Sequence, residues 1–67
     1  MELSARNQLR GRITAITLGD VMAEVQVEIG AQPLVSVITR ASAQRLGLQV
    51  GDSVVVIIKA TEVILGR

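Results

Sequence analysis

Two short polar segments near the ends of the chain carry hydrogen-bond donors and positive charge. They are Ser4–Gln8 and Lys59–Val63, and Thr39–Ser42 adds a third, hydroxyl-bearing segment between them. Arg6 offers five N–H donors in a rigid fork, and Lys59 offers a compact ammonium group. A site built only of donors suits a small, fully deprotonated oxyanion. These residue types therefore point to anion binding.

Each of these residues also has a simpler explanation. Arg6 fits a solvated surface position, and Lys59 fits the end of an apolar strand. The hydroxyls of Thr39 and Ser42 fit a helix start, where such side chains accept hydrogen bonds from the first backbone N–H groups. The unpaired N–H groups of a helix start could themselves add to an anion site. The residues alone leave both interpretations open.

The composition predicts one small domain, residues 1–67, that associates with copies of itself. The chain has no Cys and no His, so neither a disulfide nor a structural zinc site is expected to stabilise it. A chain this short buries only about 60% of its unfolded surface. Yet 49% of its residues are hydrophobic, and the mean hydropathy is +0.50. Part of this apolar surface is expected to be buried between subunits.

Several function classes fit the sequence poorly. The formal net charge is +1 and there are no aromatic residues, which argues against nucleic-acid binding through phosphate neutralisation or base stacking. Neither a nucleophile–base pair nor a metal-ligand cluster is visible, so we expect no enzyme, no catalytic cofactor and no direct metal-cation ligands. No apolar run reaches the roughly 18 residues of a membrane helix. A soluble, cytoplasmic protein without membrane association is expected.

The hydrophobic pattern predicts an all-β fold. Period-two alternation over Val21–Ile29 indicates a half-buried strand, and Gly30–Pro33 reads as a turn into a returning strand. The five expected strands cover residues 7–17, 21–29, 34–38, 53–59 and 63–65. The near-continuous apolar run of the fourth strand predicts burial on both faces, by a neighbouring subunit.

A short helix is expected between the third and fourth strands, over Ala41–Leu46, with Thr39 as N-cap and Gly47 as the left-handed residue that ends it. In the first strand the apolar face switches between Ala15 and Ile16, which predicts a bulge. This order matches an OB-like five-stranded small barrel, with an SH3-like barrel as the main alternative.

An ordered set of motifs along the whole chain resembles a known family. The motifs are Ser4-Ala5-Arg6-Asn7-Gln8, Val37-Ile38-Thr39-Arg40-Ala41-Ser42, Leu46-Gly47-Leu48, Val50-Gly51-Asp52 and Lys59-Ala60-Thr61-Glu62-Val63. The set is similar to the Mop domain, a TOBE/OB-like domain of the molbindins. These are small molybdate- and tungstate-binding proteins, also called molybdenum-pterin-binding proteins.

The resemblance implies a homohexamer, a trimer of dimers, that binds oxyanions at its subunit interfaces. The oxyanion-binding residues that it carries over to this chain are Ser4, Arg6, Thr39, Ser42, Lys59 and Ala60. The implied function is storage and homeostasis of molybdenum, with molybdate or tungstate as the ligand. The alternative is an anion-sensing regulatory or interaction module that acts on a separate protein partner.

Overall fold

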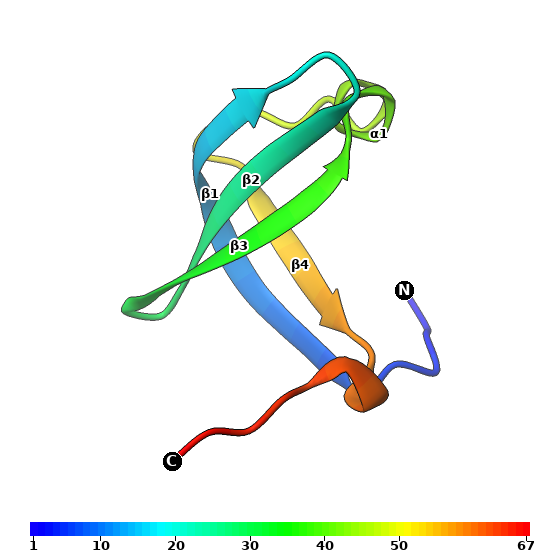
Figure 1. The fold of residues 1–67 in the computed structure, drawn as a ribbon, viewed down its shortest axis with the longest axis vertical. Coiled ribbons are helices and arrows are strands. Elements are labelled where there is room, and N and C mark those ends of the chain that lie inside the picture. Colours follow the sequence, from blue (N-terminus) through cyan, green and yellow to red (C-terminus); the bar gives the residue numbers. More distant parts are fainter.

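A computed structural model describes residues 1–67 and contains four strands and one short α-helix (Figure 1). The elements in chain order are β1 (Asn7–Leu18), β2 (Met22–Ile29), β3 (Gln32–Thr39), α1 (Arg40–Arg45), β4 (Ser53–Ile58) and a 3-10 turn, η1 (Ala60–Glu62). The all-β class is confirmed, as is the position of the helix between the third and fourth strands.

The four strands form one antiparallel sheet in the order β3-β2-β1-β4. The long β1 serves two partners, because its first half, residues 7–12, pairs with β4 and its second half, residues 12–18, pairs with β2. The sheet therefore turns around β1, and β3 and β4 are left as its two free edges (Figure 1).

β1 changes direction through a bulge and a glycine. Its register with β2 shifts between Ile13 and Ala15, which confirms the predicted bulge. A Cβ atom on Gly11 would lie 2.6 Å from side-chain atoms of both Val27 and Ile29. Glycine is therefore required where β2 crosses closest to β1.

The core of a single chain is small. Only five of its 67 residues are buried, and three of these, Ile13, Val25 and Val27, form the central cluster. Large apolar side chains such as Val35 and Val37 on β3 remain exposed. A single chain thus leaves uncovered the kind of apolar surface that the composition predicted would be buried between subunits.

The second hairpin is tighter than the sequence suggested. Ile29 pairs with Gln32, so the turn is the two residues Gly30–Ala31, and the expected turn through Pro33 is wrong. Gly30 adopts the left-handed conformation, with φ of 61°. Pro33 can lie within β3 because β3 is an edge strand, where a missing N–H group need not break the ladder.

The expected fifth strand, residues 63–65, is wrong for a single chain. After β4, η1 is held by hydrogen bonds from the N–H of Glu62 to the carbonyl of Lys59 (2.9 Å) and from the N–H of Val63 to that of Ala60 (3.3 Å). The segment beyond η1 then runs away from the sheet and pairs with neither free edge (Figure 1). The barrel is accordingly open.

β4 was expected to be buried on both faces, and in a single chain it is not. Its residues alternate between half-buried and exposed positions, with Val55 and Ile57 on the exposed side.

None of the helices has the length and apolar character that crossing a lipid bilayer requires.

Candidate anion-binding site

The β1–β4 pairing brings four of the six expected site residues to one end of the sheet. Asn7, the first residue of β1, pairs with Ile58, the last residue of β4. Arg6 directly precedes this pair and Lys59 directly follows it, so the Ser4–Gln8 segment and η1 lie side by side (Figure 1). We call Ser4, Arg6, Lys59 and Ala60 the terminal donor group.

The donors of the terminal donor group are unused within the chain. Arg6 and Lys59 are exposed and take part in none of the side-chain hydrogen bonds. The backbone N–H of Ala60 makes no backbone hydrogen bond. A hydrogen bond from the amide of Gln8 to the carbonyl of Ala5 (2.9 Å) holds the segment that carries Ser4 and Arg6. These donors are therefore available to a ligand.

The other two expected residues, Thr39 and Ser42, lie together at the start of α1. The Thr39 hydroxyl accepts a hydrogen bond from the N–H of Ser42 (3.0 Å), as an N-cap does, and donates its proton to the Ser42 Oγ (2.7 Å). The proton of the Ser42 hydroxyl then remains free to donate outward. We call these two residues the helix-start pair.

Backbone N–H groups contribute less at the helix start than the sequence suggested. The N–H of Arg40 donates to the carbonyl of Val21 (2.8 Å), and the N–H of Ser42 is used by Thr39. The guanidinium of Arg40, whose role the sequence left open, donates to the carbonyl of Gly19 (3.1 Å). The backbone N–H and the guanidinium of Arg40 thus secure the β1–β2 turn, and the N–H of Ser42 is used in capping the helix.

An open hollow of about 440 Å³ lies beside the helix-start pair. Its lining includes Asp20 together with Thr39 and Arg40. The carboxylate of Asp20 would repel a bound anion, so this hollow does not form an anion site by itself.

The structure places the terminal donor group and the helix-start pair at opposite ends of the sheet. In Figure 1, α1 lies at the top, whereas η1 and the N-terminal segment lie at the bottom. One chain therefore does not bring all six expected residues around one anion. A site that uses both groups needs two chains.

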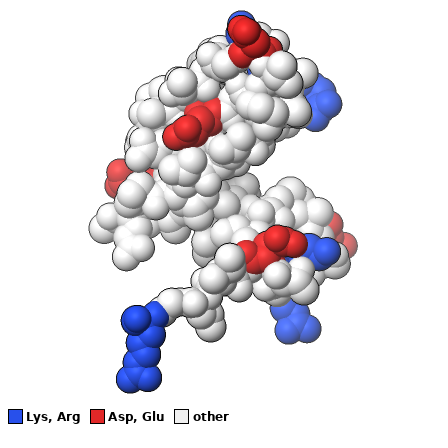
Figure 2. All heavy atoms as spheres, in the orientation of Figure 1, with Lys and Arg blue, Asp and Glu red and all other residues white.

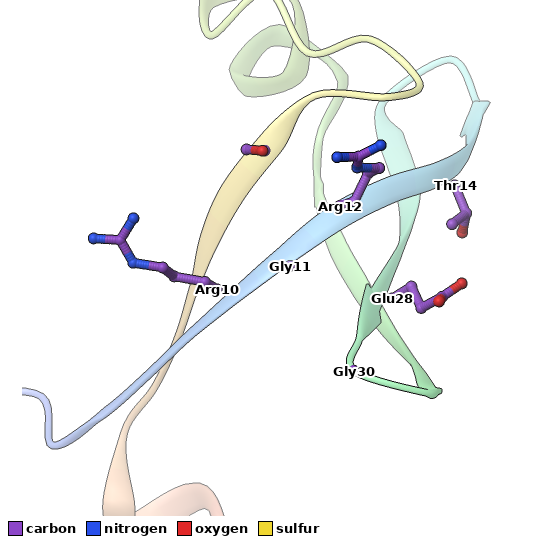
Figure 3. A pocket seen from close by; sticks show the side chains of 7 residues that line it. Arg10, Gly11, Arg12, Thr14, Glu28 and Gly30 are labelled. Atoms are coloured by element: carbon purple, nitrogen blue, oxygen red, sulfur yellow. The ribbon is translucent and has the colours of Figure 1, made fainter.

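A polar surface hollow, absent from the sequence prediction, lies along β1 and is drawn in Figure 3. Arg10 and Arg12 rise from β1 on either side of Gly11, and Glu28 of β2 pairs with Arg12 in the sheet. The sequence signal for it was the polar side chain at every second residue of β1, at Gln8, Arg10 and Arg12. The nearby carboxylate of Glu28 weakens the attraction of this hollow for an anion.

The face of the molecule drawn in Figure 2 carries no single cluster of positive charge. On that face, Lys and Arg lie at several separate places, with Asp and Glu among them. No group of three or more Asp, Glu, His or Cys residues could hold a metal cation.

The sequence matches known proteins over nearly its whole length. The TOBE domain model matches residues 3–65. The chain is 43% identical to the probable molybdenum-pterin-binding protein of Haemophilus influenzae, over 98% of this chain and 97% of that protein. It is 41% identical to molybdenum-pterin-binding protein 3 of Clostridium pasteurianum, over 97% of each. It also matches the molybdenum transport protein ModE of Herbaspirillum seropedicae at 44% identity, but spans only 24% of that longer protein.

Solved structures of molybdate-binding proteins share the fold of this chain. A molybdate-binding protein from Sporomusa ovata superposes with a TM-score of 0.96 at 36% identity, over 100% of both chains. The cytoplasmic molybdate-binding protein ModG, solved with molybdate bound, superposes with a TM-score of 0.86 at 41% identity, over 90% of this chain and 43% of that one. The chain therefore belongs to the TOBE-domain family. Within it, the chain stands with the small Mop-type proteins that the motifs indicated.

Proposed function

We propose that this protein binds molybdate or tungstate at interfaces of a homo-oligomer and stores molybdenum in the cytoplasm. The observation that carries the proposal is the full-length likeness to the Sporomusa ovata molybdate-binding protein, with a TM-score of 0.96 at 36% identity. The proposal assigns the protein a binding role and no catalytic one, in keeping with relatives that are named for binding or transport.

The chemistry of the terminal donor group supports this ligand class. Molybdate and tungstate carry no proton at neutral pH, so every oxygen can accept a hydrogen bond. Arg6, Lys59 and the N–H of Ala60 are donors only. Hydrogen bonds to charged groups contribute about 1.5–3 kcal/mol each, and a micromolar Kd needs about 8 kcal/mol. Several such bonds are enough, even after the cost of association.

The separation of the two groups supports an interfacial site. We infer that one chain supplies Ser4, Arg6, Lys59 and Ala60, and that a neighbouring chain supplies Thr39 and Ser42. The expected assembly is a hexamer of three dimers. An anion that bridges two chains stabilises their association by mass action, because it binds only the assembled form.

The test is calorimetric titration of the purified protein with molybdate and with tungstate, using sulfate and phosphate as controls. The molar mass is measured by light scattering on the same sample. We expect saturable binding of molybdate and tungstate, and much weaker binding of sulfate, on an oligomer. Absence of heat with both molybdate and tungstate would overturn the proposal.

A further inference from the structure

The polar hollow drawn in Figure 3 shares no residue with the anion site proposed above. It has a volume of about 470 Å³, and its seven lining residues come from β1, β2, β4 and the turn of the second hairpin. A smaller hollow of about 200 Å³ adjoins it and shares Arg10, Gly11 and Ser53 with it. The two hollows therefore meet where β1 pairs with β4.

The register of the sheet places polar side chains in a row across this hollow. Arg12 of β1 pairs with Ser53 of β4 on one side and with Glu28 of β2 on the other. Directly paired residues in an antiparallel sheet have their side chains on the same face. Arg10, two residues before Arg12, lies on that face as well, because side chains alternate along a strand. Two guanidinium groups, one hydroxyl and one carboxylate thus share one face of the sheet.

The hollow has a donor end and an acceptor end. Figure 3 shows Arg10 and Arg12 on the side of β1 that faces β4, where Ser53 pairs with Arg12. Thr14 and Glu28 lie on the other side of β1. The four residues of the row across the sheet are exposed and make no side-chain hydrogen bond. We call Arg10, Arg12 and Ser53 the donor end, and Thr14 and Glu28 the acceptor end.

The donor end suits the phosphate group of a phosphate ester. Such a group carries about 1.5–2 negative charges at neutral pH and has three terminal oxygens that accept hydrogen bonds. A carboxylate has two oxygens and one charge, so the fork of a single guanidinium satisfies it. The two guanidinium groups and the Ser53 hydroxyl supply one donor group for each oxygen of the phosphate.

The acceptor end restricts the rest of the ligand. The Thr14 hydroxyl donates its proton to the carbonyl of Gln26 (3.2 Å), so its oxygen is left to accept. The ionised carboxylate of Glu28 accepts hydrogen bonds only, and it repels a bare anion. A ligand that brings hydroxyl groups to this end gains hydrogen bonds there. No hydrophobic residue lines the hollow, so a nucleobase has no surface to stack on.

We propose that this hollow binds a phosphate ester that carries free hydroxyl groups, of the sugar-phosphate class. The phosphate group lies at the donor end, and the hydroxyl groups donate to the acceptor end. The inference goes beyond the proposed function and does not depend on it, because neither the terminal donor group nor the helix-start pair takes part.

The test is a titration of the purified protein followed by phosphorus NMR, with ribose 5-phosphate and inorganic phosphate as separate probes. We expect ribose 5-phosphate to bind about tenfold more tightly, because its hydroxyl groups add hydrogen bonds to a charged acceptor. Gluconate, which has hydroxyl groups and a carboxylate, should displace it only weakly. Equal binding of the two phosphates, binding of neither, or tighter binding of gluconate would overturn the proposal.

Glu28→Gln tests the acceptor end. Loss of the charge should strengthen the binding of inorganic phosphate and reduce the preference for ribose 5-phosphate severalfold, because repulsion and hydrogen-bond acceptance fall together. Glu24→Gln is the matched control, since Glu24 is an exposed carboxylate of the same strand and does not line the hollow. A preference that is the same in Glu28→Gln as in Glu24→Gln would contradict the proposed orientation of the ligand.

Arg12→Gln tests the donor end. It should weaken the binding of ribose 5-phosphate about tenfold or more, because charge-assisted hydrogen bonds are lost. Arg10→Gln is a second variant with the same expected direction, and Arg45→Gln, at the end of α1, is the control. An effect of Arg45→Gln as large as that of Arg12→Gln would reduce the hollow to general charge attraction and overturn the site. Molybdate affinity, measured by calorimetry on Arg12→Gln, should stay unchanged, so failure of this site and failure of the proposed function are observed separately.

Discussion

Arg6 is exposed and its side chain makes no hydrogen bond in its own chain, so its guanidinium is free for a ligand. We expect Arg6→Ala to weaken molybdate binding by about ten- to a hundredfold, because a charge-assisted hydrogen bond of about 1.5–3 kcal/mol is lost. Calorimetry measures the change. Arg10→Ala, four residues further along the chain and within β1, is the matched control and should leave the affinity within about twofold. Equal effects of the two variants would argue for a general charge effect.

The helix-start pair caps α1, and two substitutions can separate this structural role from the binding role that we propose for it. Thr39→Val removes the N-cap and should lower the free energy of unfolding by about 0.5–2 kcal/mol, measured by urea denaturation. Ser42→Ala keeps the N–H that Thr39 accepts from, and loses the outward donor together with the exposed Oγ that accepts the Thr39 proton. It should weaken molybdate binding with little loss of stability. Thr17→Val controls for the loss of an exposed hydroxyl, and affinity unchanged in Ser42→Ala would remove Ser42 from the site.

At the scale of elements, the bend of β1 decides where the two donor groups lie. Gly11→Ala would place a methyl group 2.6 Å from side chains of Val27 and Ile29 and 2.8 Å from the carbonyl oxygen of Glu28. We expect a loss of about 1–3 kcal/mol in the free energy of unfolding, because the backbone contact cannot yield as a side chain does. Gly66→Ala, where a Cβ meets open space, should be neutral. A neutral Gly11→Ala would mean that β1 and β2 separate easily at their crossing.

Elements defined by local chemistry were predictable from the sequence. Thr39 and Gly47 enclose α1 as expected, and the helix end makes both hydrogen bonds of a Schellman motif, from Gly47 to Gln44 (3.0 Å) and from Leu48 to Ala43 (3.2 Å). The bulge in β1 was readable because the apolar face switches there.

Features that depend on distant partners were not predictable. The three consecutive apolar residues 63–65 suit a strand, but a strand must pair with a sheet edge, and the sequence does not say which edge that is or to which chain it belongs. Likewise, the three polar segments indicated which residues carry the donors, but not which donors lie together. Their grouping follows from the pairing of β1 with β4 at one end of the sheet and from the position of α1 at the other end. Periodicity carries no information about either arrangement.

At the scale of the whole molecule, ligand and assembly should stabilise each other. Binding to the native state alone adds about 2.7 kcal/mol at a ligand concentration one hundred times Kd. We expect molybdate to raise Tm in a concentration-dependent manner, measured by calorimetry, and sulfate at the same ionic strength to leave it nearly unchanged. Dilution of the protein should lower Tm in the absence of ligand. A Tm independent of protein concentration would indicate that folding does not depend on association.

The small core of a single chain, with only five buried residues, also affects how fast the protein can mature. A core this small makes a single chain marginally stable. In the proposed homo-oligomer, the final step of maturation is then bimolecular, and its rate rises with the square of the chain concentration. The cell would accumulate finished protein efficiently only when synthesis is brisk, and slow synthesis would leave single chains exposed to proteases.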